Sequence, residues 1–126
     1  MRIYKEFLFE AAHFLPFAEP GTENARIHGH SFRCRVTLEG MPDAETGVIL
    51  HLNKVQEALS DVRGKLDHRF LNEDVEGLEL PTLEHLTLWI WGQLEAVLPG
   101  LYEVSVMRDS CGEGCIYRGS RHDNKN

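Results

Sequence analysis

Cysteine is scarce in this sequence, which has only Cys34, Cys111 and Cys115 among its 126 residues. Three is an odd number and too few for a disulfide framework, so a reducing cytoplasmic location is expected. A long apolar run is also lacking. The most apolar stretch, residues 86–98, includes a glutamine and a glutamate and is shorter than the roughly 20 residues that a membrane-spanning helix needs. Acidic residues interrupt the apolar N-terminal segment, which makes it a poor signal peptide, and we expect no membrane partner.

Positive charge is in short supply as well. The 13 lysines and arginines are outnumbered by 20 acidic residues, which leaves a formal net charge of −7. Nonspecific binding to nucleic acid needs a basic face, so the composition argues against a nucleic-acid partner. The length suits one domain with a modest core. We expect this domain over residues 1–119, followed by a polar tail over residues 120–126.

Hydrophobic periodicity predicts four strands and two helices. Alternation of apolar and polar residues indicates the strands, and apolar residues at helical spacing indicate the helices. Thr82 is the candidate N-cap of the second helix. In order, the predicted elements are strand 3–13, strand 28–38, helix 52–66, a helix from Thr82 to about 98, strand 101–109 and strand 116–119. This ββααββ order predicts an α+β fold, in which an antiparallel four-stranded sheet carries both helices on one face.

Three histidines are predicted to share one surface of that sheet. His28 and His30 are two residues apart in a strand and therefore point to the same side. His13 ends the preceding strand, and antiparallel pairing would bring it beside them. Three histidines without a fourth protein ligand describe an open catalytic zinc site, and a nitrogen-only set favours zinc over nickel or copper. The alternative is an accidental His-Gly-His and a packed core histidine; the shared surface favours the metal.

Other residues carry weaker signals. An acid next to a histidine, as in Asp67-His68, can orient the imidazole or share its proton, but the pair alone is more typical of a helix end beside a surface acid. Asp109 is a lone acid at a strand end, where solvation is the usual state. Cys34 lies on the predicted core face and is expected to pack there.

Five segments together resemble one enzyme family. They are FEAAH (9–13), HGHSF (28–32), LDHRFLN (66–72), PTLEHLTLWIW (81–91) and CIYRG (115–119). In order over residues 3–119, they are similar to the 6-pyruvoyl-tetrahydropterin synthase family, above all to its bacterial branch that makes 6-carboxy-tetrahydropterin for queuosine biosynthesis. The resemblance implies the tunnelling fold (T-fold). It also implies homotrimers whose sheets form a barrel, usually stacked as homohexamers, with active sites between subunits.

The resemblance also implies roles for individual residues. His13, His28 and His30 take the positions of the zinc ligands. Asp67 and His68 take those of an acid–histidine pair that handles protons. The implied activity is that of a zinc-dependent carbon–carbon lyase acting on 7,8-dihydroneopterin triphosphate, a small-molecule substrate.

Four further positions concern the substrate. The family anchors the pterin ring with a glutamate, and here Asp109 occupies that slot with the same charge and one methylene less. Thr82 falls where the family contacts the pterin. The bacterial branch has a proton-abstracting cysteine four residues before its HGH motif. Asn24 stands there in this sequence, and an amide cannot serve as a base at neutral pH. Glu23 is adjacent, and some relatives use a glutamate near this site and release a 6-hydroxymethyl pterin.

Three functions therefore remain open. The first is the 6-carboxy-tetrahydropterin synthase reaction. The second is a pterin aldolase reaction in which Glu23 replaces the cysteine. The third is a catalytically silent protein that binds zinc or pterin, and the Asp67-His68 pair argues against it because a binder has less use for a proton relay. Arg26, or basic residues of a neighbouring subunit, would supply positive charge for the triphosphate.

Overall fold

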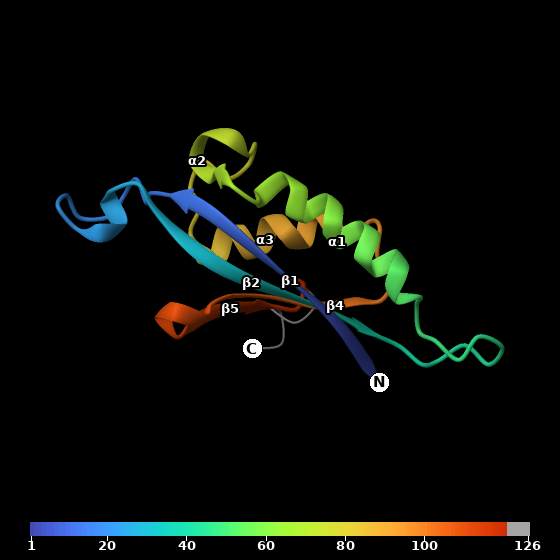
Figure 1. Ribbon diagram of the computed structural model, residues 1–126. Helices are drawn as coiled ribbons and strands as arrows, with labels where there is room; N and C mark the ends of the chain where they lie inside the picture. The colour runs from blue at the N-terminus through green and yellow to red at the C-terminus, as the bar shows by residue number, and fades with distance from the viewer. Residues whose placement is uncertain (121–126) are drawn as a thin grey trace.

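The computed structural model describes residues 1–120 and consists of one sheet with helices on one side (Figure 1). The strands lie in the order β3-β1-β2-β4-β5. The elements are β1 (Arg2–His13), the 3₁₀ turn η1 (Glu23–Ala25), β2 (His28–Glu39), α1 (Leu52–Leu66), β3 (Arg69–Phe70), α2 (Leu71–Asp74), α3 (Leu83–Leu94), β4 (Leu101–Arg108), the 3₁₀ turn η2 (Asp109–Cys111) and β5 (Glu113–Tyr117).

The α+β class and the helices on one face agree with the prediction, but the sheet differs from it in detail. A fifth strand, β3, pairs parallel with β1, so the sheet is mixed rather than antiparallel throughout. The short helix α2 follows it directly. Neither was predicted, because two strand residues show no alternation and one helical turn shows no periodicity. Apart from Ser120, the predicted tail lies outside the described residues.

The last hairpin is tighter than its sequence suggested. Strand β5 begins at Glu113 rather than at residue 116. Gly112 closes η2 in the left-handed conformation, with φ of 67° and ψ of 34°. Because one glycine makes the turn, the residues expected to form a loop are free to pair with β4.

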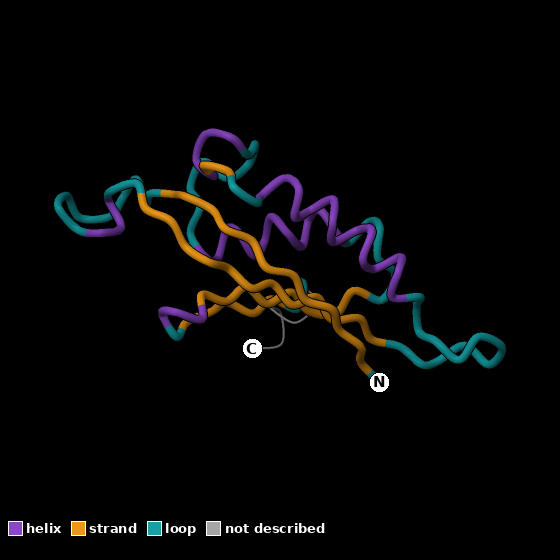
Figure 2. The backbone as a smooth tube through the Cα atoms, viewed as in Figure 1, coloured by secondary structure: helices purple, strands orange, loops and turns teal. Residues whose placement is uncertain are grey.

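Strands β1 and β2 form the longest pairing in the molecule. Each has 12 residues, and they pair antiparallel from Arg2↔Glu39 to His13↔His28. The connection over residues 14–27 projects beyond the ends of both strands (Figure 2). The end of β1 and the start of β2 therefore meet at the base of this loop, as predicted.

The core lies between the sheet and the two long helices. Phe9 and Phe32 stack from neighbouring strands with ring centroids 4.8 Å apart, and both are buried. The spacing of apolar residues in α1 predicted a buried row of Leu52, Val55, Leu59, Val62 and Leu66, and the helix buries the last four, whereas Leu52 in its first turn is exposed. Cys34 is fully buried, which raises the pKa of its thiol and fits the expected packing role. The side chain of Thr82 caps α3 by accepting a hydrogen bond from the His85 backbone N–H.

The opposite face of the sheet is polar, and no helix within residues 1–120 covers it (Figure 1). Glu6 accepts hydrogen bonds of 2.7 Å from Arg33 and from Arg35. The bond from Arg35 is the main cause of the lowered pKa of Glu6. Tyr4 and Leu8 are exposed on the same face. No helix in the described part of the chain is long and apolar enough to cross a membrane.

Gly100, which leads into β4, packs closely against the end of the β1–β2 pair that lies far from the histidines. Its φ is +78°, and a Cβ atom there would lie 2.8 Å from the backbone oxygen of Glu39. Gly47 has a similar φ of +76° but open space around it. Both alanine variants lose about 1 kcal/mol to the left-handed backbone, and Gly100→Ala loses about 1–3 kcal/mol more to overpacking. Urea unfolding of the two variants measures the difference, and equal losses would contradict the close approach.

Candidate metal centre and surrounding site

The three predicted histidines converge at the base of the 14–27 loop. Their nearest ring nitrogens all lie within 4.8 Å of one another. His13 is buried, with 1% of its surface exposed, and His28 and His30 are half-buried. The register explains the convergence, since His13 pairs with His28 and Ala11 pairs with His30.

Backbone carbonyls determine which nitrogen faces the centre in the rings of His13 and His28. His13 donates from Nδ1 to the carbonyl of Pro81 at 2.9 Å, and His28 donates from Nδ1 to the carbonyl of Arg26 at 2.7 Å. A carbonyl only accepts hydrogen bonds, so both Nδ1 atoms carry the proton in the neutral rings. Nε2 is then unprotonated in both residues and carries a free lone pair. Metal-ligating histidines are commonly oriented in this way, by an acceptor that binds the N–H on the far side of the ring.

The convergence of these lone pairs fits a cation. The Nε2 atoms of His13 and His28 are 3.1 Å apart, although neither has a proton to share. Two nitrogens bound at 2.0–2.1 Å to a tetrahedral zinc lie roughly 3.3 Å apart, so the observed spacing matches a metal site. The residues present therefore fit zinc, with the fourth position open to a ligand.

Burial and neighbouring charge keep the rings of His13 and His30 neutral. Burial is the main cause that lowers the pKa of His13 from 6.5 to about 4, and the neighbouring His28, His30 and Arg108 contribute to this shift. Burial also lowers the pKa of His30, followed by the charge of Arg108. Neutral imidazole is the form that binds a metal, so the site is ready for one at neutral pH.

A cavity of about 710 Å³ opens beside His28 and His30. The residues Glu23 and Asn24 of η1 line it, and so does Arg26. Its volume lies within the range of small-molecule sites. The structure thus places the two loop positions singled out by the sequence in the same cavity as two of the histidines.

Asp67 and His68 are joined by a hydrogen bond. His68 donates from Nδ1 to Asp67 at 2.9 Å, while the other carboxylate oxygen of Asp67 accepts from the Glu10 backbone N–H. The hydrogen bond from Glu10, followed by that from His68, lowers the pKa of Asp67. His68 has a φ of 59°, a left-handed conformation that is strained for a residue with a side chain. An ionised acid thus orients an exposed imidazole, whose Nε2 is free to exchange a proton.

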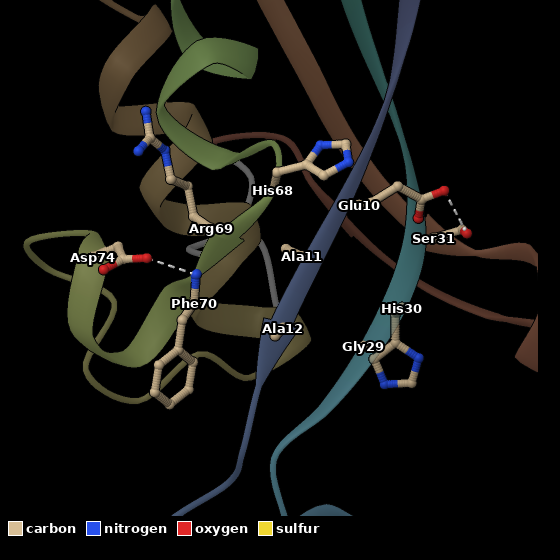
Figure 3. Close-up of a pocket in the computed structure, with 10 residues that line it drawn as sticks. All are labelled: Glu10, Ala11, Ala12, Gly29, His30, Ser31, His68, Arg69, Phe70 and Asp74. Atoms are coloured by element: carbon tan, nitrogen blue, oxygen red, sulfur yellow. Dashed lines mark hydrogen bonds between the residues drawn. The ribbon is translucent and has the colours of Figure 1, made fainter.

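Strand β1 separates this pair from the metal centre. His68 precedes β3, and β1 lies between β3 and β2, which places the backbones of His68 and His30 roughly 10 Å apart. Figure 3 shows the two side chains on either side of β1, around a cavity of about 600 Å³. Within residues 1–120 the structure does not bring His68 into contact with the three histidines.

The two predicted pterin-binding residues lie in different places. Thr82 lines a cavity of about 480 Å³ together with His13. Asp109 instead lies at the polar face of the sheet, where Arg33 donates to both carboxylate oxygens at 2.9 and 3.2 Å. The hydrogen bond from Arg33 lowers the pKa of Asp109.

The sequence reading missed Arg108 and Glu113. The Nη2 atom of Arg108 donates to Glu113 at 2.6 Å, and Nη1 lies 3.4 Å from Nε2 of His30. A signal was present, because Arg108 continues the alternation of Val104 and Val106 and so belongs to the face that points toward the helices. A charged residue at the end of such an apolar row indicates a functional site, as the histidines do.

The sequence and the fold both match proteins of one family. Residues 2–120 match the family described as 6-pyruvoyl tetrahydropterin synthase. The chain belongs to this family. A 6-carboxy-5,6,7,8-tetrahydropterin synthase from Synechocystis is 41% identical over 94% of both chains. A dihydroneopterin monophosphate aldolase from Pyrococcus furiosus is 33% identical over 90% of both chains.

The fold comparison agrees with the sequence match. The 6-pyruvoyl tetrahydropterin synthase of Caenorhabditis elegans superposes with a TM-score of 0.83 at 26% identity, over 95% of this chain and 96% of that chain. The predicted T-fold is therefore confirmed. Membership in the 6-pyruvoyl tetrahydropterin synthase family supports a tetrahydropterin-synthase-like enzyme.

Zinc binding tests the metal centre directly. Protein stripped with EDTA and reloaded is expected to hold one zinc per chain. His30→Ala is expected to weaken zinc binding at least roughly 100-fold, because it removes one of three ligands. His51→Ala is the matched control, since His51 is an exposed residue at the start of α1 and lines none of the cavities around the centre. Competition with a chromophoric chelator measures the affinities; an unchanged affinity of His30→Ala would refute the site.

The pKa of His13 predicts how the metal-free protein responds to acid. Its folded-state pKa of about 4 lies below the ordinary value of 6.5, so the unfolded chain binds a proton that the folded chain does not. Stability is then full above pH 6.5 and falls as the pH drops toward 4, by about 2 kcal/mol between pH 6.5 and 5. Urea unfolding in EDTA measures this loss, and His13→Gln should reduce it. A stability that stays level over this range would contradict the assignment.

Proposed function

We propose that the chain is a zinc-dependent lyase of the 6-carboxy-tetrahydropterin synthase type, acting on 7,8-dihydroneopterin triphosphate in queuosine biosynthesis. The products of that reaction are 6-carboxy-tetrahydropterin, acetaldehyde and triphosphate. The observation that carries the proposal is the convergence of one ring nitrogen each from His13, His28 and His30 in a member of this family. The 41% identity to the Synechocystis synthase supports this branch of the family.

The three histidines would hold the zinc. Zinc bound there would act as a Lewis acid that lowers the pKa of hydroxyl groups on the substrate side chain. The carbonyls of Pro81 and Arg26 keep the lone pairs of His13 and His28 directed at the metal position. The side chain of Arg26 lines the adjoining cavity, where it is placed to bind the triphosphate.

Proton transfer is assigned to His68, with Asp67 as its orienting acid. Because β1 separates this pair from the metal centre of the same chain, we assign the pair to the site of a neighbouring copy. The proposed assembly is a homotrimer, or two trimers stacked as a hexamer. The polar sheet face with its exposed Tyr4 and Leu8 is the surface that such an assembly would cover.

The pterin ring is assigned to Asp109 of one copy and Thr82 of a neighbouring copy, because the two residues lie in different places within one chain. The carboxylate of Asp109 is ionised and held by Arg33, and its remaining lone pairs are able to accept hydrogen bonds from the amino and NH groups of a pterin. Arg33 holds the carboxylate in one orientation, which helps a side chain that is one methylene shorter than glutamate. The hydroxyl of Thr82 caps α3 and faces the cavity that it shares with His13.

Glu23 supports a second function, that of a pterin aldolase. Its side chain lines the same cavity as His28, His30 and Asn24, and a carboxylate can accept the proton that an asparagine cannot. The 33% identity to the aldolase of Pyrococcus furiosus is consistent with this chemistry. The expected product is then a 6-hydroxymethyl pterin.

Product analysis decides between these functions. Zinc-loaded protein is incubated with 7,8-dihydroneopterin triphosphate, and the pterins are identified by mass spectrometry beside an EDTA-stripped control. We expect zinc-dependent 6-carboxy-tetrahydropterin. A 6-hydroxymethyl pterin would assign the aldolase reaction instead. Unchanged substrate, with zinc demonstrably bound, would leave a zinc- or pterin-binding protein as the remaining interpretation.

Variants of the loop extend the same experiment. Asn24→Cys restores a thiol base and is expected to raise the rate of 6-carboxy product formation by roughly 100-fold. If Glu23 is the base, Glu23→Gln lowers the wild-type rate by a similar factor. Glu19→Gln is the control, since Glu19 belongs to the same exposed loop and lies outside the residues that line the cavity.

A further inference from the structure

Arg108 is a charged side chain that the assigned reaction does not yet use. It stands at the end of β4, and only 13% of its side-chain surface is exposed. Its Nε atom is buried and finds no acceptor within residues 1–120. A buried donor without a partner is costly in a folded protein, so this group calls for an explanation.

The position of Arg108 connects it to the metal centre. Nη2 is held by Glu113, while Nη1 lies 3.4 Å from Nε2 of His30. Arg108 and Glu113 also line both the cavity that contains His28 and the cavity that contains His13 and Thr82. The guanidinium is thus fixed between the two cavities that adjoin the three histidines.

The contact with His30 competes with metal binding. Nε2 has one lone pair, so a zinc ion bound to that nitrogen would displace Arg108. Nη1 would then lose its acceptor, and Nε already lacks one within residues 1–120. Glu113 neutralises the guanidinium charge but occupies only Nη2. Two nitrogens of the guanidinium would then lack an acceptor, and Nη1 is the one that borders the ring of His30.

We propose that Arg108 is the anion-binding residue of this site, and that its guanidinium binds a negatively charged oxygen of the ligand next to the three histidines. On the proposed substrate, on which this inference rests, that oxygen belongs to the side chain where charge develops during the lyase reaction. Glu113 is a positioning residue, because it holds the guanidinium in place. Charge-assisted hydrogen bonds of this kind act most strongly in partly buried sites.

A pair of small probes tests the anion site without catalysis. Glycolate carries a hydroxyl and a carboxylate, and glycolamide is its neutral counterpart. Calorimetric titration of the zinc-loaded protein is expected to show glycolate binding that Arg108→Met weakens at least roughly 10-fold, while glycolamide binding changes less than about twofold. Arg108→Lys keeps the charge, and its affinity for glycolate should lie between those of the wild type and Arg108→Met. Arg118→Met is the control, because Arg118 makes an Arg–Glu pair with Glu103 elsewhere.

Several outcomes would overturn the proposal. Equal loss of glycolate and glycolamide binding, or no loss of either, would show that Arg108 does not select an anion. A variant that loses zinc would reveal a structural role instead. Weaker binding of inorganic tripolyphosphate with unchanged glycolate binding would assign Arg108 to the phosphates.

Turnover provides the second readout. With 7,8-dihydroneopterin triphosphate, Arg108→Met is expected to lower kcat by roughly 100-fold with a smaller change in KM, since the charge develops mainly in the transition state. A kcat within about threefold of wild type would contradict the inference. If the wild-type protein does not turn this substrate over, the proposed function fails, and the glycolate titration still decides whether Arg108 binds anions.

Discussion

The antiparallel register between β1 and β2 is the constraint on which the rest of the site depends. It places His13 opposite His28 and Ala11 opposite His30, at the end of a 12-residue pairing. Side chains alternate faces along a strand, so a slip of one residue would move every histidine of one strand to the wrong face. The buried Phe9–Phe32 stack lies on the same face and opposes such a slip. The packing of the core thereby maintains the geometry of the metal centre.

The electrostatics of the centre follow from that geometry. Burial lowers the pKa of His13, which keeps the ring neutral, and two carbonyls from separate loops accept hydrogen bonds from the outward Nδ1–H groups of His13 and His28. The lone pairs are left facing one another at a distance that suits a shared cation. The same enclosure holds Arg108 near the centre with Glu113 as its counter-charge. A cationic metal and a cationic guanidinium in one site are compatible when the ligand between them is an anion.

Much of the fold was predictable because its signals are local and repeated. Strand alternation over residues 2–13 and 28–39 and helical spacing in α1 extend over many residues, and the Thr82 cap is a single strong preference. Strand β3 and helix α2 were missed because each is too short to show a period. Strand β3 exists because the backbone of β1 offers hydrogen bonds at its edge, and that edge is formed by tertiary structure.

The candidate site, too, was predictable from the sequence only in part. Three features could be recognised in the sequence, because residue type and strand period determine them. They are the spacing of His28 and His30, the position of His13, and the Asp67-His68 pair. Tertiary structure alone decided three other contacts. They are the hydrogen bond from His13 to the carbonyl of Pro81, the hydrogen bond from Arg33 to Asp109, and the contact of Arg108 with His30. Each joins residues that lie 68 to 78 positions apart in the chain. Contacts over such separations depend on how the whole sheet and its loops come together, and no local pattern encodes them.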